Sequence, residues 1–185
     1  MSRGVLAMAD VQALVAKAQD GDVDAWEALY RRAYPRLLAY ARRRLEGEAA
    51  KEAVSETMAR AVAGMATFRP TGPGFEGWLF GICRHVVLDA QRAAGRRGYA
   101  VPVTEQASNE PAPGDGLLLG EEYAAVRAAF SRLNEKDREL LELRVVAGLT
   151  AEETATVLGR RAGAVRTAQT RALKRLRHHL EELER

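Results

Sequence analysis

A run of basic side chains near the C-terminus has the residue types and spacing to bind phosphate groups. It consists of Arg160, Arg161, Arg166, Arg171, Lys174, Arg175 and Arg177. No acidic residue interrupts the run before Glu181, whereas the preceding segment 135–153 is net acidic. Cations gathered in this way lie where the phosphates of a nucleic acid would lie, and each neutralised phosphate adds salt-sensitive affinity. The alternative is a solvated basic helix that binds nothing.

The segments that position this basic run carry the signals of a helix-turn-helix. Thr150 and Glu153 have the spacing of a capping box, in which each side chain accepts a hydrogen bond from the other residue's backbone amide. Gly159 can adopt the left-handed conformation that ends a helix. A short helix over 151–158, a glycine-containing turn and a longer helix over 162–183 would present the second helix to a major groove. Capping box, turn and charge together favour DNA binding over the solvated helix.

The chain as a whole predicts two helical lobes separated by a linker. Apolar residues recur at helical spacing over 10–94 and again over 117–183, and alternating strand-like runs are essentially missing. The segment 95–116 contains four glycines, three prolines and few large apolar residues, which is typical of a flexible linker. We therefore expect an all-α protein of two small domains joined by a flexible linker.

The first lobe is expected to form a four-helix unit. The apolar spacing predicts helices over 10–18, from Asp22 or Asp24 to about 45, and over 49–65 and 75–94. Pro35 is expected to interrupt or restart the second of these. The buried stripe of that second helix is predicted to be Trp26, Leu29, Ala33, Leu37, Leu38, Ala41 and Leu45. The loop 67–74 holds two prolines and two glycines, and such a stiff loop is a candidate functional surface.

Composition limits the class of protein. Hydrophobic residues make up 47% and charged residues 29%, which fits a folded globular protein and not a disordered one. Cys83 is the only cysteine, so an intramolecular disulfide is excluded and a reducing compartment is favoured. A signal peptide and a run of 18 apolar residues are both missing. We therefore expect a cytoplasmic protein without membrane insertion.

The sequence offers no constellation for catalysis. His85, His178 and His179 are scattered or terminal, and no nucleophile, base and orienting group fall together. We expect no enzyme activity, no catalytic residues, no metal and no cofactor. Two other classes stay open. One is a stand-alone repressor or response-regulator output domain, although 10–94 predicts neither a parallel sheet nor a glycine-rich phosphate loop. The other is an adapter that sequesters a partner through its helices.

Motifs in both lobes resemble bacterial RNA polymerase sigma factors of the sigma-70 family. In the second lobe, the segments 133–141 and 148–153 and the residues Gly163 to Leu176 resemble sigma domain 4. In the first lobe, the residues that resemble the polymerase-docking helix are Glu52, Val54, Glu56, Thr57, Arg60 and Ala61. Those that resemble the promoter-melting helix are Phe75, Trp78, Leu79, Ile82 and Arg84. The resemblance covers nearly the whole chain. Because the chain lacks the larger insertions and the middle domain of housekeeping sigma factors, it is similar to the compact extracytoplasmic-function (ECF) group.

The resemblance implies an alternative sigma factor. Such a protein binds core RNA polymerase, directs promoter-specific initiation by reading the minus-35 and minus-10 elements, and aids DNA melting. The first lobe would be sigma domain 2 and the second lobe sigma domain 4. The implied partners are core RNA polymerase and promoter DNA. Family members often have an anti-sigma factor, which makes such an inhibitor a candidate partner that could clamp the two lobes together.

The resemblance also implies three sets of site residues. Polymerase docking would use Glu52, Ser55, Glu56 and Arg60, which share one helical face because they are three and four residues apart. The minus-10 element would contact Phe68, Arg69, Trp78, Arg84, His85, Asp89, Arg92, Arg96 and Arg97. The minus-35 element would contact Arg161, Ala162, Arg166, Thr167, Thr170, Arg171 and Lys174. Trp78 lies near Leu79 and Ile82 in sequence, and we favour a core role for it over a role as a base platform.

Overall fold

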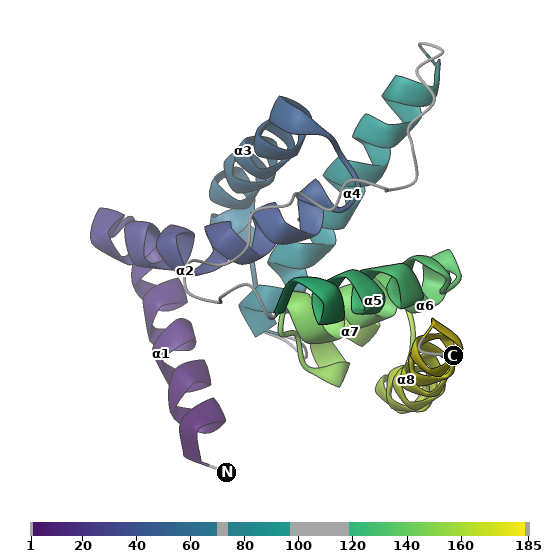
Figure 1. The fold of residues 1–185 in the computed structure, drawn as a ribbon. Coiled ribbons are helices and arrows are strands. Elements are labelled where there is room, and N and C mark those ends of the chain that lie inside the picture. The colour runs from purple at the N-terminus through teal and green to yellow at the C-terminus, as the bar shows by residue number, and fades with distance from the viewer. Residues whose placement is uncertain (1, 70–73, 97–118, 184–185) are drawn as a thin grey trace.

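The computed structural model describes residues 2–69, 74–96 and 119–183, and all regular structure within these ranges is helical (Figure 1). The elements are α1 (Ser2–Gln19), α2 (Val23–Arg42), α3 (Gly47–Gly64), the 3₁₀ turn η1 (Met65–Thr67), α4 (Gly74–Arg96), α5 (Leu119–Ser131), α6 (Glu135–Leu141), the π-helical turn η2 (Glu142–Val146), α7 (Ala151–Leu158) and α8 (Ala162–Leu183). This order confirms the predicted all-α fold. None of the described helices is long and apolar enough to cross a membrane.

Helices α1 to α4 form the first domain. Helix α4 packs against α3, and α2 packs against both α1 and α3. The core is formed by the apolar faces of these helices, with Leu37, Leu79 and Phe80 fully buried. The ring of Tyr40 meets that of Phe80 edge to face at 6.1 Å. Burial of these large side chains is the main source of the domain's stability, because apolar area removed from water contributes about 25 cal/mol per Å².

Helix α2 corrects the prediction that Pro35 interrupts it. The helix begins at the N-cap Asp22, whose side chain accepts a hydrogen bond from the Ala25 amide at 3.0 Å, and it runs unbroken through Pro35 to Arg42. A proline inside a helix leaves the carbonyl four residues earlier without its donor. Both Pro35 and Arg31 lie on the exposed side of α2, where water can satisfy that carbonyl.

The buried stripe of α2 also differs in part from the prediction. Leu29, Ala33, Leu37 and Ala41 are buried as expected, and so is Leu45 beyond the end of the helix. Trp26 and Leu38, however, are only half-buried, and Ala25 and Tyr40 take the central positions. The reason is steric. The small Ala25 fits close to the neighbouring helices, whereas Trp26 packs at the margin of the core.

Helices α5 to α8 form the second domain. Asn134 caps α6 by accepting a hydrogen bond from the Asp137 amide at 3.0 Å. Helix α6 is followed directly by the π-helical turn η2. Helix α8 is held by Val165, which packs with Leu140, Ala151 and Ala155, and by Ala172, which packs with Leu133 and Leu141. All of these residues are buried. The domain is therefore organised around its last helix.

The two domains pack directly against each other. Helix α7 lies along α4, as Figure 1 shows at the lower end of α4, and η2 contacts α2. Leu143, Ala147, Leu149 and Val157 of the second domain are buried in the same apolar cluster as the core of the first. The sequence predicted two separate bundles, and the apolar contact between them is a new finding.

Helix α4 extends further than expected at the start of the predicted linker. Gly95 and Arg96 continue the helix, which ends at Arg96. The other linker positions, 97–116, lie outside the described residues. The linker prediction is therefore neither confirmed nor contradicted over those positions.

Candidate nucleic-acid interfaces

Helix α8 presents its basic side chains to solvent, as the helix-turn-helix prediction requires. The capping box is present: the Glu153 amide donates to Thr150 Oγ1 at 3.1 Å, and the Thr150 amide donates to Glu153 Oε2 at 2.6 Å. Gly159 ends α7 with φ at 63°, in the left-handed region. These two features fix the direction in which the chain enters α8, so the capping-box and turn predictions are confirmed.

Six of the seven residues predicted to contact the minus-35 element are exposed on α8 or just before it. They are Arg161, Arg166, Thr167, Thr170, Arg171 and Lys174. Ala162, the seventh, is half-buried and packs against the cluster around Val165. We name the six exposed residues the α8 surface. The structure places five of them on α8 and Arg161 directly before it, but whether they contact DNA stays a prediction.

Two arginines of the basic run are held by ion pairs within the second domain. Arg166 pairs with Glu152 of α7, and both side chains are exposed. Arg175 makes two hydrogen bonds to the Asp137 carboxylate, at 2.7 and 2.9 Å, and Asp137 is buried. Paired, fork-like contacts of this kind fix both position and orientation. Arg175 therefore anchors α8 to α6, whereas Arg166 can exchange its exposed carboxylate for another acceptor.

The predicted docking residues share one exposed face of α3. Glu52, Ser55, Glu56 and Arg60 are all exposed, and the helix turns its opposite face, including Val54 and Thr57, into the core. Arg60 Nε donates to Glu56 Oε1 at 2.7 Å. Below we call these four residues the α3 face. Its common orientation is confirmed, and its polymerase contact remains a prediction.

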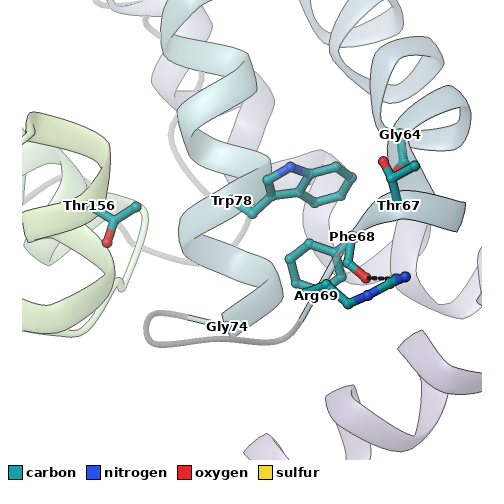
Figure 2. A pocket seen from close by; sticks show the side chains of 7 residues that line it. All are labelled: Gly64, Thr67, Phe68, Arg69, Gly74, Trp78 and Thr156. Atoms are coloured by element: carbon teal, nitrogen blue, oxygen red, sulfur yellow. Dashed lines mark hydrogen bonds between the residues drawn. The ribbon is translucent and has the colours of Figure 1, made fainter.

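A pocket opens beside the loop predicted to hold a minus-10 base (Figure 2). It is lined by Gly64, Thr67, Phe68, Arg69, Gly74, Trp78 and Thr156. The rings of Phe68 and Trp78 lie 4.7 Å apart at a tilt of 34°, and Phe75 meets Phe68 edge to face. Residues 70–73 of the loop lie outside the described residues. The pocket therefore has one aromatic wall, made from the ends of η1 and α4.

Phe68 and Trp78 both pack in the core, which was predicted for Trp78 but not for Phe68. Phe68 is only 7% exposed, so its ring packs inside the domain and is not offered as a platform. Trp78 is half-buried and packs against the apolar core, which agrees with the core role favoured for it. Its indole lies on Gly64, where an added Cβ would come within 3.1 Å of the ring. Gly64 thus makes room for the aromatic wall, a role that sequence analysis missed.

Two side chains hold the turn at the edge of the pocket by hydrogen bonds to its backbone. The side-chain amide of Gln19, at the end of α1, donates to the carbonyls of Met65 at 3.0 Å and Phe68 at 2.8 Å. Arg69 is exposed, and its guanidinium donates to the Phe68 carbonyl at 3.2 Å. Gln19 was not predicted, because only the fold brings α1 next to η1. It ties down the turn from which Arg69 projects.

The remaining predicted minus-10 residues divide between two sides of α4. His85, Asp89, Arg92 and Arg96 are exposed, and their spacings of four, three and four residues place them on one helical face. His85 Nδ1 lies 2.8 Å from the Gly81 carbonyl, and Arg92 pairs with Asp89 at 2.9 Å. Arg97 lies outside the described residues.

Arg84 is separate from that exposed face. Its Nε donates to Glu139 Oε1 of the second domain at 2.9 Å, and the side chain is half-buried. Burial lowers the pKa of Arg84, but the hydrogen bond and charge of Glu139 outweigh it, so the pKa is raised above its usual range. Arg84 is thus held by the second domain in this arrangement, and no sequence signal pointed to Glu139 as its partner.

Comparison with known proteins gives matches in both domains. The Sigma-70 region 2 family matches residues 29–97, and the family Sigma-70, region 4 matches residues 123–176. The ECF RNA polymerase sigma factor ShbA of Streptomyces griseus is 38% identical over 183 residues, covering 93% of this chain and 96% of that protein. SigD of Mycobacterium tuberculosis, also an ECF RNA polymerase sigma factor, is 36% identical over 177 residues, covering 92% of this chain and 84% of SigD.

Two solved structures share the fold. CnrH, determined in complex with the cytosolic domain of CnrY, has a TM-score of 0.68 and 24% identity, covering 94% of this chain and 98% of that chain. The sigma factor RpoE of Bartonella quintana, determined with the anti-sigma factor NepR, has a TM-score of 0.66 and 24% identity, covering 84% and 96%. At this identity the likeness concerns the arrangement of the helices alone.

Proposed function

The chain belongs to the ECF RNA polymerase sigma factors, which direct promoter-specific transcription, and from this premise we propose how its surfaces divide the work. The α3 face binds core RNA polymerase. The pocket at Trp78 and the exposed face of α4 read the minus-10 element, and the α8 surface reads the minus-35 element. The protein has no reaction of its own and acts in the cytoplasm.

The observation that carries this proposal is the separation of three exposed surfaces on three helices. The α3 face is polar and contains both acidic and basic side chains, which suits a protein partner with polar and charged groups. The α8 surface is cationic and polar, and it follows a fixed helix-turn-helix entry. Arginine can pair with both acceptors of a guanine edge in the major groove, whereas the short threonines suit several bases. Each surface can therefore engage its partner without displacing another.

The pocket supports a role in holding one base of the opened strand. Taking a base out of the stack costs a few kcal/mol, which new contacts must offset. Arg69 and Thr67 can supply polar contacts at the rim, and the edge of Trp78 supplies an apolar wall. Phe68, which is buried, supports the wall from behind. In this proposal DNA melting is assisted by capture of a base that has already left the duplex.

Transcription reconstituted from core RNA polymerase, the purified chain and a library of promoter sequences tests the proposal. We expect transcripts from a subset of templates that share two short elements. Glu52→Ala combined with Glu56→Ala should abolish association with core polymerase. Glu27→Ala combined with Glu135→Ala is the matched control, because it removes two exposed carboxylates outside α3, and it should leave the association unchanged. Failure to associate with core polymerase, together with no start-site selection on any template, would overturn the proposal.

An anti-sigma factor is a further proposed partner. The fold is shared with RpoE, whose structure includes the anti-sigma factor NepR. We propose that an inhibitor of this class clamps the two domains together and keeps the α3 face from polymerase. Co-expression of a candidate inhibitor should lower transcription from the selected promoters and protect the α3 face from hydrogen exchange. Inhibition with that face unprotected would show that the inhibitor acts elsewhere.

A further inference from the structure

The second domain places two carboxylates against arginines of the first. Glu139 on α6 accepts hydrogen bonds from Arg84 Nε at 2.9 Å and Nη2 at 3.4 Å, and from the Tyr40 hydroxyl at 3.3 Å. Glu142 at the start of η2 pairs closely with Arg44 and lies 3.8 Å from Arg43. The Glu139 side chain is 16% exposed and the Glu142 side chain 7%. Both acids therefore depend on these arginines.

The three arginines form one surface where α2 ends beside α4. Arg43 and Arg44 follow directly after α2, and Arg84 lies in the middle of α4. The Arg44 guanidinium stacks 4.0 Å from the centre of the Tyr40 ring, and the Arg43 guanidinium lies over the Phe130 ring of the second domain at 5.6 Å. We call Arg43, Arg44 and Arg84 the arginine surface. Every one of them has a carboxylate of the second domain as a partner.

Joining two domains through buried ion pairs costs desolvation free energy. Removing charges from water costs several kcal/mol per ion, and the mutual attraction of a pair often only offsets that cost. Burial accordingly raises the pKa of Glu142, although Arg44 and Arg43 act against the shift. The apolar contacts of Leu143, Leu149 and Val157 already bury area between the domains. The ion pairs therefore add little net stability to the interface between the domains, which leaves their arginines available for another role.

Three closely spaced guanidinium groups suit a linear polyanion. Arginine is weakly hydrated and forms fork-like contacts with carboxylate and phosphate alike, so a site that fits two carboxylates also fits backbone phosphates. The surface lies around the side of α4 from the proposed minus-10 face, because consecutive helical residues such as Arg84 and His85 are about 100° apart around the helix axis. A nucleic-acid strand that passed from that face around α4 would reach Arg84, and it could not contact Arg84 while Glu139 is in place.

We propose that the arginine surface binds the phosphate backbone of single-stranded DNA, and that Glu139 and Glu142 occupy it in the free protein. The inference builds on the proposed role of α4 in minus-10 recognition. The α3 face and the α8 surface stay exposed while the two domains are closed. Polymerase can therefore dock on the closed protein. The arginine surface of the first domain becomes accessible to DNA only when the second domain moves away.

Binding of a labelled 20-nucleotide oligothymidylate to the full-length chain, followed by fluorescence anisotropy without polymerase, tests this proposal. The variant Glu139→Gln combined with Glu142→Gln keeps side-chain shape but removes the competing charges. We expect its affinity to rise about tenfold, because the fraction of molecules with an accessible surface increases. The slope of log affinity against log salt should steepen by about 2, since each phosphate contact on a single strand contributes about 0.7.

Glu27→Gln combined with Glu48→Gln is the matched control. It changes the net charge equally, and both carboxylates are exposed and lie away from the interface, in ion pairs with Arg31 and Lys51. This control should change the affinity less than twofold. Adding Arg43→Gln to the variant that lacks both interface carboxylates should lower its affinity and reduce its salt slope by about 0.7. Circular dichroism checks folding, and the single Glu139→Gln variant replaces the double one if the latter does not fold.

Equal affinities for the interface variant and the control would overturn the proposal. It would also be overturned if small-angle scattering showed that the interface variant opens while its affinity stays at the wild-type value. The oligothymidylate contains no promoter element, and polymerase is absent from the assay. A failure here is therefore distinct from a failure of the proposed function, which appears only in reconstituted transcription.

Discussion

Phe68 and Arg69 are neighbours in the chain, yet their environments differ completely. The Phe68 ring is packed between Phe75 and Trp78, whereas Arg69 is exposed at the rim of the pocket. We predict that Phe68→Ala lowers the free energy of unfolding by about 3 kcal/mol, because truncation of a buried phenylalanine leaves a cavity. Arg69→Ala should change it by less than about 0.5 kcal/mol. Urea unfolding measures both values.

The same two variants separate packing from DNA contact. On a promoter that the protein recognises, Arg69→Ala should slow opening of the duplex, measured by permanganate reactivity of unpaired thymines. A Phe68→Ala protein that keeps its wild-type stability but loses opening would show that Phe68 itself touches a base, contrary to our assignment.

Arg166 is the arginine of the α8 surface whose position best suits base recognition. Its ion pair with Glu152 is exposed, and such pairs contribute only about 0 to 1 kcal/mol, so the guanidinium is free to exchange acceptors. We predict that Arg166→Ala lowers promoter-specific transcription by roughly 5- to 150-fold, the equivalent of a bidentate base contact of about 1 to 3 kcal/mol. Binding to core polymerase should be unchanged.

Arg177→Ala, nearer the end of α8, is the control for Arg166. It removes the same charge from an exposed position of the same helix and should reduce transcription far less. If Arg166→Ala weakens polymerase binding as much as promoter use, the division of labour between the domains is wrong.

Cys83 is a buried thiol whose ionisation should affect stability at high pH. Burial raises its pKa from the ordinary 9.0 to about 11, despite a hydrogen bond with Thr57 that lowers it. Between these pH values the unfolded chain loses the proton and the folded chain keeps it, so stability falls as pH rises. We predict that the difference in unfolding free energy between wild type and Cys83→Ala narrows from pH 9 to pH 11. A constant difference in urea unfolding under reducing conditions would contradict this.

At the scale of elements, the turn between α7 and α8 sets the orientation of the basic helix α8 relative to α7. Gly159 has φ at 63°, where a side chain costs about 1 to 2 kcal/mol. Gly163, four residues later, is helical and has open space around it. We predict that Gly159→Ala lowers the unfolding free energy by about 1 kcal/mol, while Gly163→Ala raises it by up to about 1 kcal/mol through helix propensity.

Thermal or urea unfolding of the two glycine variants provides the comparison, because the two substitutions add the same methyl group to one supersecondary unit. Equal effects of the same sign would mean that the left-handed conformation at Gly159 is not required. Helix α8 would then have to be oriented by its packing and by the Arg175 contact with Asp137 alone.

At the scale of the whole molecule, the two domains share an apolar cluster and three ion pairs, in which Arg43, Arg44 and Arg84 contact Glu139 or Glu142. This closed arrangement differs from one in which the domains reach two separated promoter elements. A compact chain of 185 residues has a radius of gyration of about 16 Å. We predict that small-angle scattering of the free protein gives a value close to this, and that the distance between labels on α3 and α8 increases when core polymerase binds.

A constant label distance in the free and polymerase-bound forms would contradict that prediction. It would mean that the closed arrangement persists on polymerase, and the arginine surface could not then be released in the way that we propose. Labels on two positions of α3 provide the control, since their separation should not change in either form.

Local signals in the sequence were sufficient for most elements. The capping box at Thr150 and the left-handed Gly159 depend on residues a few positions apart, and the exposed face of α3 follows from helical periodicity, so all three could be predicted from sequence. The prediction failed at Pro35, because packing of the rest of a helix can offset the lost hydrogen bond and the steric clash that one proline causes. Here α2 packs against α1 and α3, and Arg31, whose carbonyl loses its donor, lies on the exposed side. Both conditions depend on the tertiary structure.

Only the tertiary structure decided which distant groups meet. Glu139 and Arg84 are 55 residues apart, and Gln19 and Phe68 are 49 apart, so no periodicity could pair them. Family resemblance supplied the surfaces from sequence, including Arg84 as a DNA contact. The folded chain shows that this arginine is held by the second domain, because packing of α7 on α4 brings α6 and its carboxylate within hydrogen-bond distance. Sequence thus determined the helices and their charged side chains. Folding determined which of those side chains are paired with a residue of the other domain.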